Sequence, residues 1–151
     1  MSSLRARVMS SDNINIHIAS WQKDRAVLAK IRRQIFIEEQ NVPEEMEWDE
    51  HDDSSTHFFV TSGQQVVAVA RLKPDGQIGR MGVLSDYRRQ GIGSKLLDFV
   101  LRLAASKKLA KVYLHAQTQA ISFYEDHGFT AQGDIFYEAN IAHREMLKKI
   151  C

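Results

Sequence analysis

Near the middle of the chain, over residues 78–97, an apolar strand pattern passes through a glycine-containing turn directly into an amphipathic helix. The turn holds Arg88, Arg89, Gly91 and Gly93. Glycine lets the backbone approach a ligand closely, and the free N–H groups at a helix N-terminus attract anions. The pattern predicts a site for a pyrophosphate, although two glycines at this spacing also suit tight packing of a helix on a sheet.

The rest of the chain predicts further strands and helices around this unit. Apolar residues that alternate with polar ones indicate strands, and apolar residues at helical spacing indicate helices. The predicted strands span 14–19, 57–61, 66–72, 78–83, 111–116, 129–137 and 141–149, and the predicted helices follow Asp24, follow Gly93 and cover 118–127. This order predicts an α/β (α+β, three-layer) fold with a mixed, mostly antiparallel central sheet of about seven strands and helices on both faces.

Composition excludes several classes of protein. Hydrophobic residues make up 44% of the 151 residues and charged residues 26%, and the net charge is +1, which does not favour nucleic-acid binding. Cys151 is the single cysteine, so no internal disulfide can form. No apolar run is long enough to span a membrane. We expect a cytoplasmic protein with a flexible tail over residues 1–12 and a single domain over 13–151.

Two motifs resemble those of the GNAT N-acetyltransferases. The first is Arg88-x-x-Gly91-x-Gly93, followed by Leu96-Leu97, and the second is Ala120-x-x-Phe123-Tyr124-Glu125-x-x-Gly128-Phe129. Shorter matches resemble the ElaA-like subgroup: residues 36–43 with Asp49, Asp52 and His57, then residues 78–80, residues 115–117, and Glu138-x-x-Ile141-x-His143-x-x-Met146. The resemblance covers residues 14–150 and implies the GNAT fold with acetyl-CoA as cosubstrate and no metal.

The resemblance also implies where acetyl-CoA binds. The pantetheine arm would pair with the strand at Met81, Gly82 and Val83, and an N–H of this strand would stabilise the oxyanion of the tetrahedral intermediate. The turn and the start of the helix would hold the pyrophosphate. The implied cofactor-binding residues are Met81, Gly82, Val83, Arg88, Arg89, Gln90, Gly91, Ile92, Gly93, Ser94, Phe123 and Tyr124.

Three residues are candidates for the proton transfers of the reaction. Tyr124 matches the family position that protonates the leaving sulfur, and a phenol carries its proton at neutral pH. Glu39 and His115 are the candidate bases. Each has an ordinary interpretation as well: Tyr124 as a helix-face tyrosine, Glu39 as a solvated helix end, and His115 as a satisfied strand histidine. A relay of water to bulk solvent also remains open.

The acceptor pocket is expected at the end of the first helix, with Phe36, Glu39, Gln40, Trp48 and His143 as substrate-binding residues. Glu138 and His143, on the last strand pair, either reach this pocket or are ordinary polar residues of a sheet face. The acidic run 44–53 is expected to be a solvated loop, with a pocket-lining role as the alternative, and Trp48 either covers the acceptor site or caps the core. The run fits neither an EF-hand nor a zinc spacing.

The leading hypothesis is acetyl transfer to a primary amine of a small molecule or peptide, by direct attack in a ternary complex. The alternatives are an acyl-CoA-binding regulatory module without turnover and a nucleotide-phosphate binder that uses the same loop. Exposed apolar residues on the last strands leave a homodimer open. The strand 78–83 carries no glutamate, where many members of the family keep their base.

Overall fold

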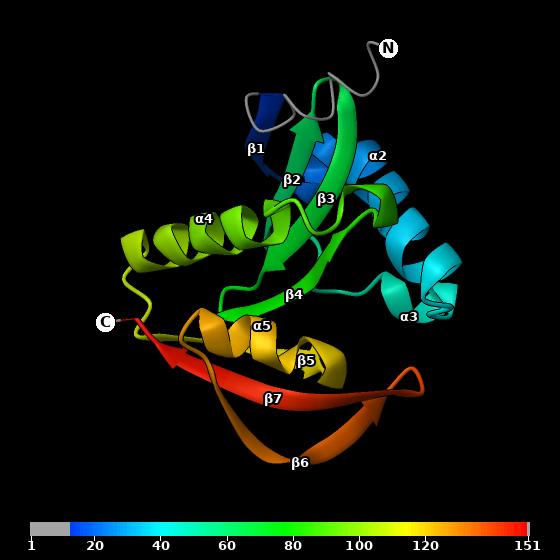
Figure 1. Ribbon diagram of the computed structural model, residues 1–151. Helices are drawn as coiled ribbons and strands as arrows, with labels where there is room; N and C mark the ends of the chain where they lie inside the picture. The colour runs from blue at the N-terminus through cyan, green and yellow to red at the C-terminus, as the bar shows by residue number, and fades with distance from the viewer. Residues whose placement is uncertain (1–12, 151) are drawn as a thin grey trace.

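The computed structural model describes residues 13–150 and contains one seven-stranded sheet (Figure 1). The strands are β1 (Ile14–Ala19), β2 (Thr56–Ser62), β3 (Gln65–Leu72), β4 (Gln77–Val83), β5 (Lys111–Gln117), β6 (Thr130–Glu138) and β7 (Ile141–Lys149), in the order β1-β2-β3-β4-β5-β7-β6. Every neighbouring pair is antiparallel except β4 and β5. The predicted mixed, mostly antiparallel sheet of seven strands is confirmed. The predicted tail over residues 1–12 lies outside the described residues.

The helices lie on both faces of the sheet. They are α2 (Trp21–Arg32), its π-helical continuation η2 (Arg33–Glu39), α3 (Glu44–Glu47), α4 (Ile92–Ser106) and α5 (Ile121–Asp126), with short 3₁₀ turns η3 (Ser85–Tyr87) and η4 (Thr118–Ala120). None of the helices within residues 13–150 has the length and apolar character needed to span a membrane.

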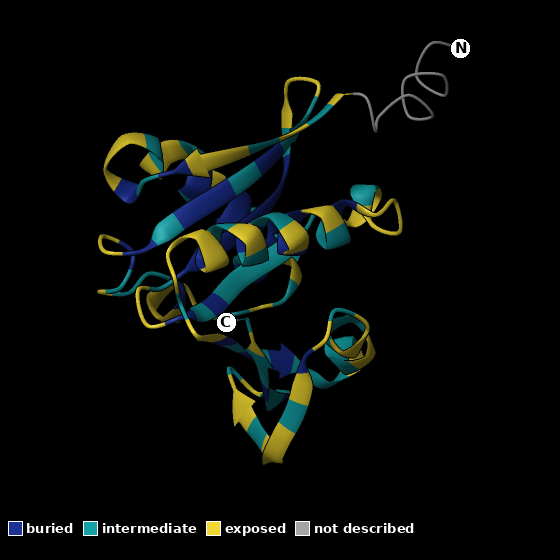
Figure 2. Cartoon of the chain, turned by 90° about the vertical axis from the view of Figure 1, so that its left-hand side faces the viewer, coloured by how far each residue is buried: buried dark blue, intermediate teal, exposed yellow. Residues whose placement is uncertain are grey.

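Two hydrophobic clusters, one on each face, hold the helices to the sheet. Leu97 and Val100 of α4 pack with Phe58 of the sheet, whereas Leu28 and Ile31 of α2 pack with Val69. All six side chains are fully or almost fully buried. Figure 2 looks onto α4 and shows its exposed residues facing outward. The helical spacing of the apolar residues in the sequence predicts these buried faces correctly.

Strand β4 changes direction at a bulge. Val69 of β3 pairs with Gly82 and Arg71 pairs with Gly79, so three steps along β4 face two along β3. An extra residue of this kind bends a strand and re-aims its side chains. Arg80 lies in the bulge with a φ of +48°, a left-handed conformation that non-glycine residues seldom adopt.

The parallel contact between β4 and β5 is short. It comprises the pairs Gln77–Tyr113 and Ile78–Leu114 only, and the two strands diverge beyond them. A slit therefore opens in the middle of the sheet, with the bulged end of β4 on one side and the end of β5 on the other. Backbone groups on this edge of β4 have no β-strand partner from β5, as an added strand would require.

Candidate active site

Two connected cavities occupy the slit between β4 and β5. The larger has a volume of about 580 Å³ and reaches from η2 and α3 to the β6–β7 hairpin. The smaller, of about 460 Å³, lies over the turn that precedes α4. Met81, Ala120 and Tyr124 line both cavities and mark where they meet. A long ligand can therefore lie with one end at the helix and its other end at the larger cavity.

The smaller cavity gathers almost all of the residues predicted to bind the cofactor. They are Met81, Gly82, Val83, Arg88, Arg89, Gly91, Ile92, Gly93, Ser94, Phe123 and Tyr124. Gln90 is the exception: it does not line the cavity, and its side-chain amide donates to the carbonyl oxygen of Asp86 at 3.4 Å.

The local backbone at this turn suits an anion. Gly91 precedes the first residue of α4 with a φ of +83°, and Arg89 has a φ of +65°. This conformation exposes the first N–H groups of a 15-residue helix toward the cavity. A side-chain carbon at Gly93 would lie 3.6 Å from the ring of Phe123, which is an ordinary contact distance. The protein itself therefore does not demand glycine at position 93.

Glu39 does not line the larger cavity, in which it was predicted to act as a base. Its carboxylate receives hydrogen bonds from Arg88, with an Nη–Oε distance of 2.7 Å. Arg88 also donates from Nε to the carbonyl oxygen of Val83 at 2.9 Å. Glu39 thus holds Arg88 in the turn that precedes α4 (residues 88–91, here called the anion turn). Phe36 and Gln40, which were predicted to bind the acceptor, do line the larger cavity.

Tyr124 stands at the junction of the two cavities. Its hydroxyl lies 3.9 Å from the sulfur of Met81, and desolvation by burial raises the pKa of the phenol to about 12. The hydroxyl keeps its proton throughout the physiological range and can serve as a proton donor. The role of Tyr124 as general acid stays a prediction.

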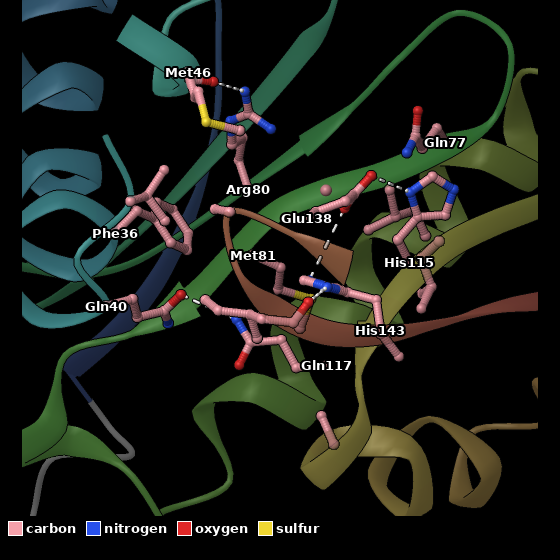
Figure 3. Close-up of a pocket in the computed structure, with 18 of the residues that line it drawn as sticks. Phe36, Gln40, Met46, Gln77, Arg80, Met81, His115, Gln117, Glu138 and His143 are labelled. Atoms are coloured by element: carbon pink, nitrogen blue, oxygen red, sulfur yellow. Dashed lines mark hydrogen bonds and ion pairs between the residues drawn. The ribbon is translucent and has the colours of Figure 1, made fainter. Parts of the chain in front are cut away.

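Glu138 joins two histidines across the floor of the larger cavity (Figure 3). His115 Nδ1 lies 3.1 Å from one carboxylate oxygen, and His143 Nε2 lies 4.0 Å from the other. The hydrogen bond with His115 lowers the pKa of Glu138, and the same bond raises the pKa of His115 above its usual value. Both shifts favour the charged pair, with Glu138 ionised and His115 protonated, over the neutral pair.

The prediction of a solvated acidic loop over residues 44–53 agrees with the exposure of Glu44, Glu45, Glu50 and Asp53 but is wrong for Glu47 and Asp52. Glu47 and Asp52 are almost completely buried. Asp52 accepts hydrogen bonds from Arg32 at 2.8 Å and from Arg71 at 2.9 Å, and Glu47 pairs with Arg32 at 2.8 Å. Buried carboxylates need such partners because burial without them is very costly.

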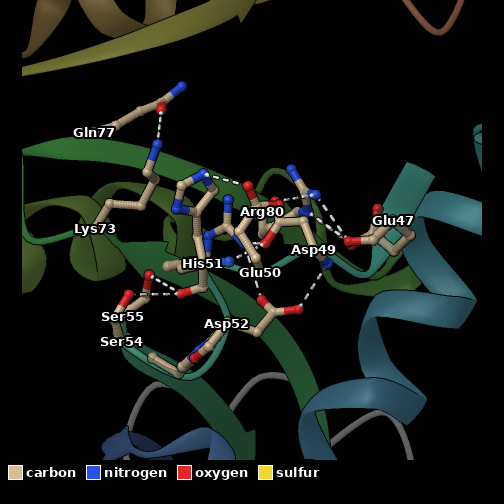
Figure 4. A network of polar contacts seen from close by, with 12 residues as sticks. Glu47, Asp49, Glu50, His51, Asp52, Ser54, Ser55, Lys73, Gln77 and Arg80 are labelled. Carbon is tan, nitrogen blue, oxygen red and sulfur yellow. Dashed lines mark hydrogen bonds and ion pairs between the residues drawn. The ribbon is translucent and has the colours of Figure 1, made fainter. Parts of the chain in front are cut away.

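Arg80 connects this buried ion-pair network (Arg32, Glu47, Asp49, Asp52, Arg71 and Arg80) to the slit (Figure 4). It pairs with Glu47 at 3.1 Å and Asp49 at 3.2 Å, and it also donates to the carbonyl oxygen of Glu47 at 2.8 Å. The three arginines balance the three carboxylates, so the network is neutral as a whole. It fixes the bulge of β4 against α3, and Glu47 and Arg80 form part of the cavity wall.

Trp48 does not line either of the two cavities. Its ring lies 6.2 Å from the ring of Trp21 and 5.1 Å from the guanidinium carbon of Arg32. Of the two predictions for this residue, the structure shows the core-capping one. Among the residues described, no group of three or more histidine, cysteine, aspartate or glutamate side chains could hold a metal ion.

Comparison with known proteins gives one consistent family. Residues 8–150 match the family described as Acetyltransferase (GNAT) domain. An uncharacterized N-acetyltransferase of Bacillus subtilis, YjcF, is 34% identical over 122 residues, which cover 78% of this chain and 87% of that protein. Crystal structures of similar fold include Escherichia coli ElaA, with a TM-score of 0.81 at 24% identity, covering 89% of this chain and 99% of that one.

A second similar structure is a GNAT family acetyltransferase from Elizabethkingia anophelis with acetyl-CoA bound. Its TM-score is 0.69 at 18% identity, and the match covers 91% of this chain and 99% of that one. At such identity the likeness concerns the fold alone.

Proposed function

This chain belongs to the GNAT acetyltransferase family, and we propose that it transfers an acetyl group from acetyl-CoA to the primary amine of a small molecule or a peptide. The observation that carries the proposal is the position of Tyr124, a protonated phenol at the junction of the two cavities. Acetyl transfer needs a proton donor where a thioester from one side meets an amine from the other.

The smaller cavity fits the phosphate end of acetyl-CoA. The backbone N–H groups at the start of α4, with Arg88 and Arg89, supply donors and positive charge. The edge of β4 at Met81 and Val83 lacks a pairing partner from β5, which suits the amide groups of a pantetheine arm. These features support acetyl-CoA as the cosubstrate.

The reaction would be a direct transfer. A neutral amine attacks the thioester carbon, and an N–H of β4 stabilises the oxyanion, a kind of contact that contributes ~3–4 kcal/mol in other enzymes. When the carbon–sulfur bond breaks, the hydroxyl of Tyr124 gives its proton to the sulfur. The proton-accepting side would be the larger cavity, where Glu138, His115 and His143 lie. Location in the cytoplasm and formation of a homodimer remain predictions from the sequence.

Thermal unfolding with acetyl-CoA, and with ATP as the control, tests the cofactor. A ligand at 100-fold its Kd adds about 2.7 kcal/mol to the free energy of unfolding, which raises the Tm of a domain of this size by roughly 5–10 °C. We expect this shift with acetyl-CoA and none with ATP. An equal shift with both would indicate the nucleotide-phosphate binder, and no shift with millimolar acetyl-CoA would overturn the proposal.

Release of free CoA thiol with a panel of primary amines then tests turnover. Transfer should depend on the amine and should fall strongly in Tyr124→Phe. A regulatory acyl-CoA-binding module would instead bind acetyl-CoA without transferring acetyl to any amine, and Tyr124→Phe would leave that binding unchanged.

A further inference from the structure

His143 lies in the larger cavity with its ring held in one orientation. Its Nδ1 lies 2.6 Å from the carbonyl oxygen of Ile141, and its ring stacks on Phe136 at 5.9 Å with 23° between the planes. A carbonyl oxygen can only accept a hydrogen bond, so Nδ1 must carry the hydrogen. In the neutral imidazole the lone pair is then on Nε2, the nitrogen 4.0 Å from Glu138.

His115 is bonded differently. Its Nδ1 faces Glu138 at 3.1 Å, and its Nε2 lies 3.9 Å from a carboxylate oxygen of Glu145. With a carboxylate at each nitrogen, both positions favour N–H groups and the charged ring. A protonated imidazole cannot accept a proton. His115 is therefore suited to hold Glu138 in place, not to deprotonate an amine.

We propose that His143 is the general base and that His143 Nε2 and Glu138 Oε1 together bind the ammonium group of the acceptor. The inference rests on the proposed acetyltransferase function and deepens it. His115 becomes a positioning residue that acts through Glu138. The sequence-based expectation gave His115 the catalytic role and His143 substrate binding, and this proposal exchanges the two.

The spacing of the two acceptors fits one ammonium nitrogen. Consider two hydrogen bonds from one nitrogen, each with a nitrogen–acceptor distance of ~2.8 Å. If their acceptors lie 4.0 Å apart, the bonds form an angle of about 90° at the nitrogen, which is within about 20° of the tetrahedral angle of an ammonium group. A carboxylate and a neutral imidazole nitrogen are both good acceptors for such donors. His143 lines the same cavity as Met81, one of the residues at the junction where the thioester would lie, and Figure 3 labels both.

The proton balance is complete with these residues. The first proton of the ammonium passes to His143 Nε2, and the freed lone pair forms the bond to the thioester carbon. The second proton leaves the nitrogen for water as the carbon–sulfur bond breaks and the sulfur takes the Tyr124 proton. His143 then gives its proton to water, and Tyr124 regains a proton from water. Two protons thus reach water and one is taken from it, so that each turnover releases one proton net.

Nitrogen-15 NMR of the histidine rings tests the tautomer without any knowledge of the natural acceptor. At pH 8, with acetyl-CoA present, His143 should show a protonated Nδ1 and an unprotonated Nε2. Methylamine, the simplest alkyl amine, should shift the Nε2 signal in the natural protein and not in Glu138→Gln. A ring protonated at Nε2, or no response to methylamine in the natural protein, would overturn the inference.

Kinetics provide the second test, with 2-phenylethylamine as the acceptor at saturating acetyl-CoA. His143→Gln should lower kcat by about 10²–10⁴-fold and should remove the decline of kcat/KM at acidic pH that a histidine base produces. Glu138→Gln should mainly raise KM for the amine. The ionisable side chains that line this cavity with His143 are Glu47, Arg80, His115, Tyr124, Tyr137 and Glu138, and all of them remain in His143→Gln.

His17→Gln is the matched control, because His17 is exposed on β1 and bonded to Thr61. It should leave both kcat and the pH profile unchanged. If His143→Gln keeps the acidic limb of the profile while acetyl-CoA still raises the Tm, the inference fails and the acetyltransferase function stands. If acetyl-CoA has no effect on the Tm of the natural protein, the function itself fails.

Discussion

Ile78 and Leu114 are the last residues that pair between β4 and β5, and the two strands separate beyond them. The arrangement of the two cavities depends on this separation. The anion turn before α4 lies on one side, the acceptor cavity with Glu138 and His143 on the other, and Tyr124 between them. The sheet is continuous enough to bury a core and open enough to contain the two cavities, in which we propose that acetyl-CoA binds.

Replacing Tyr124 by Phe should separate binding from chemistry. The change removes the proton donor and leaves the ring, so kcat should fall by about 10²–10⁴-fold while the Tm shift with acetyl-CoA stays the same. Because the pKa of Tyr124 is raised to about 12, ionisation of the phenol should not limit the natural enzyme below pH 11. Stopped assays over pH 6–10 would check both points, and an unchanged kcat would remove Tyr124 from the mechanism.

Gly93→Ala should change stability and cofactor binding in opposite directions. The added carbon meets Phe123 at an ordinary 3.6 Å, and the position lies within α4. Alanine favours a helix over glycine by up to about 1 kcal/mol, so the Tm without ligand should stay the same or rise. The methyl group would, however, occupy space next to the proposed pyrophosphate, and the Tm shift with acetyl-CoA should shrink. An undiminished shift would place the cofactor elsewhere.

Gly82→Ala should destabilise the fold whether or not a ligand binds. A side-chain carbon at Gly82 would lie 2.8 Å from the Cγ2 of Ile35 and 3.3 Å from the ring of Phe36. Both side chains are buried, and overpacking of this kind costs about 1–3 kcal/mol. Gly79→Ala on the same strand is the control, because nothing lies within 4 Å of its added carbon. Urea unfolding of both variants should show the loss in Gly82→Ala alone.

Asp52→Ala should be strongly destabilising, by about 3–5 kcal/mol, because it leaves Arg32 and Arg71 buried without a shared carboxylate. The exposed pair of Arg33 and Glu44 is the comparison, and Glu44→Ala should have little effect. Urea midpoints at pH 7 would measure both. Equal losses in the free energy of unfolding would mean that the buried ion-pair network stabilises the fold no more than the exposed pair does.

The same residue gives a pH dependence. Burial acts to raise the pKa of Asp52, but the hydrogen bonds and charges of Arg32 and Arg71 outweigh it and lower the pKa below the usual 3.8. A lowered pKa in the folded state means stability that is present above pH 3.8 and lost as the pH falls below it. Unfolding curves between pH 2 and 6 should show this decline in the natural protein and a weaker one in Asp52→Ala.

The fold could be predicted from the sequence because local patterns and tertiary packing agree. Alternating residues indicate β1, and helical spacing indicates α4, although α4 begins at Ile92 and not after Gly93 as predicted. The anion turn was predictable for the same reason, since a strand, a glycine turn and a helix lie next to one another in the chain.

The acceptor side depends on contacts between distant segments, which the sequence does not display. Glu39 looks like a pocket residue until Arg88, 49 positions away, is found bonded to it. The run of acidic residues at 44–53 has the composition of a solvated loop. Glu47 and Asp52 are nevertheless buried, because Arg32, Arg71 and Arg80 from distant segments pair with them. The different roles of His115 and His143 depend on hydrogen-bond partners, which residue type alone does not reveal.

The two walls of the acceptor cavity differ in how freely they can change. One wall, with Glu47 and Arg80, belongs to the buried ion-pair network, in which a single substitution leaves a charge without its partner. The other wall carries Tyr137 and Ile141 on the β6–β7 hairpin, where Tyr137 is 71% exposed. Directed evolution toward new amines should therefore succeed more often at exposed hairpin residues such as Tyr137 than in the charged wall, where a substitution costs stability.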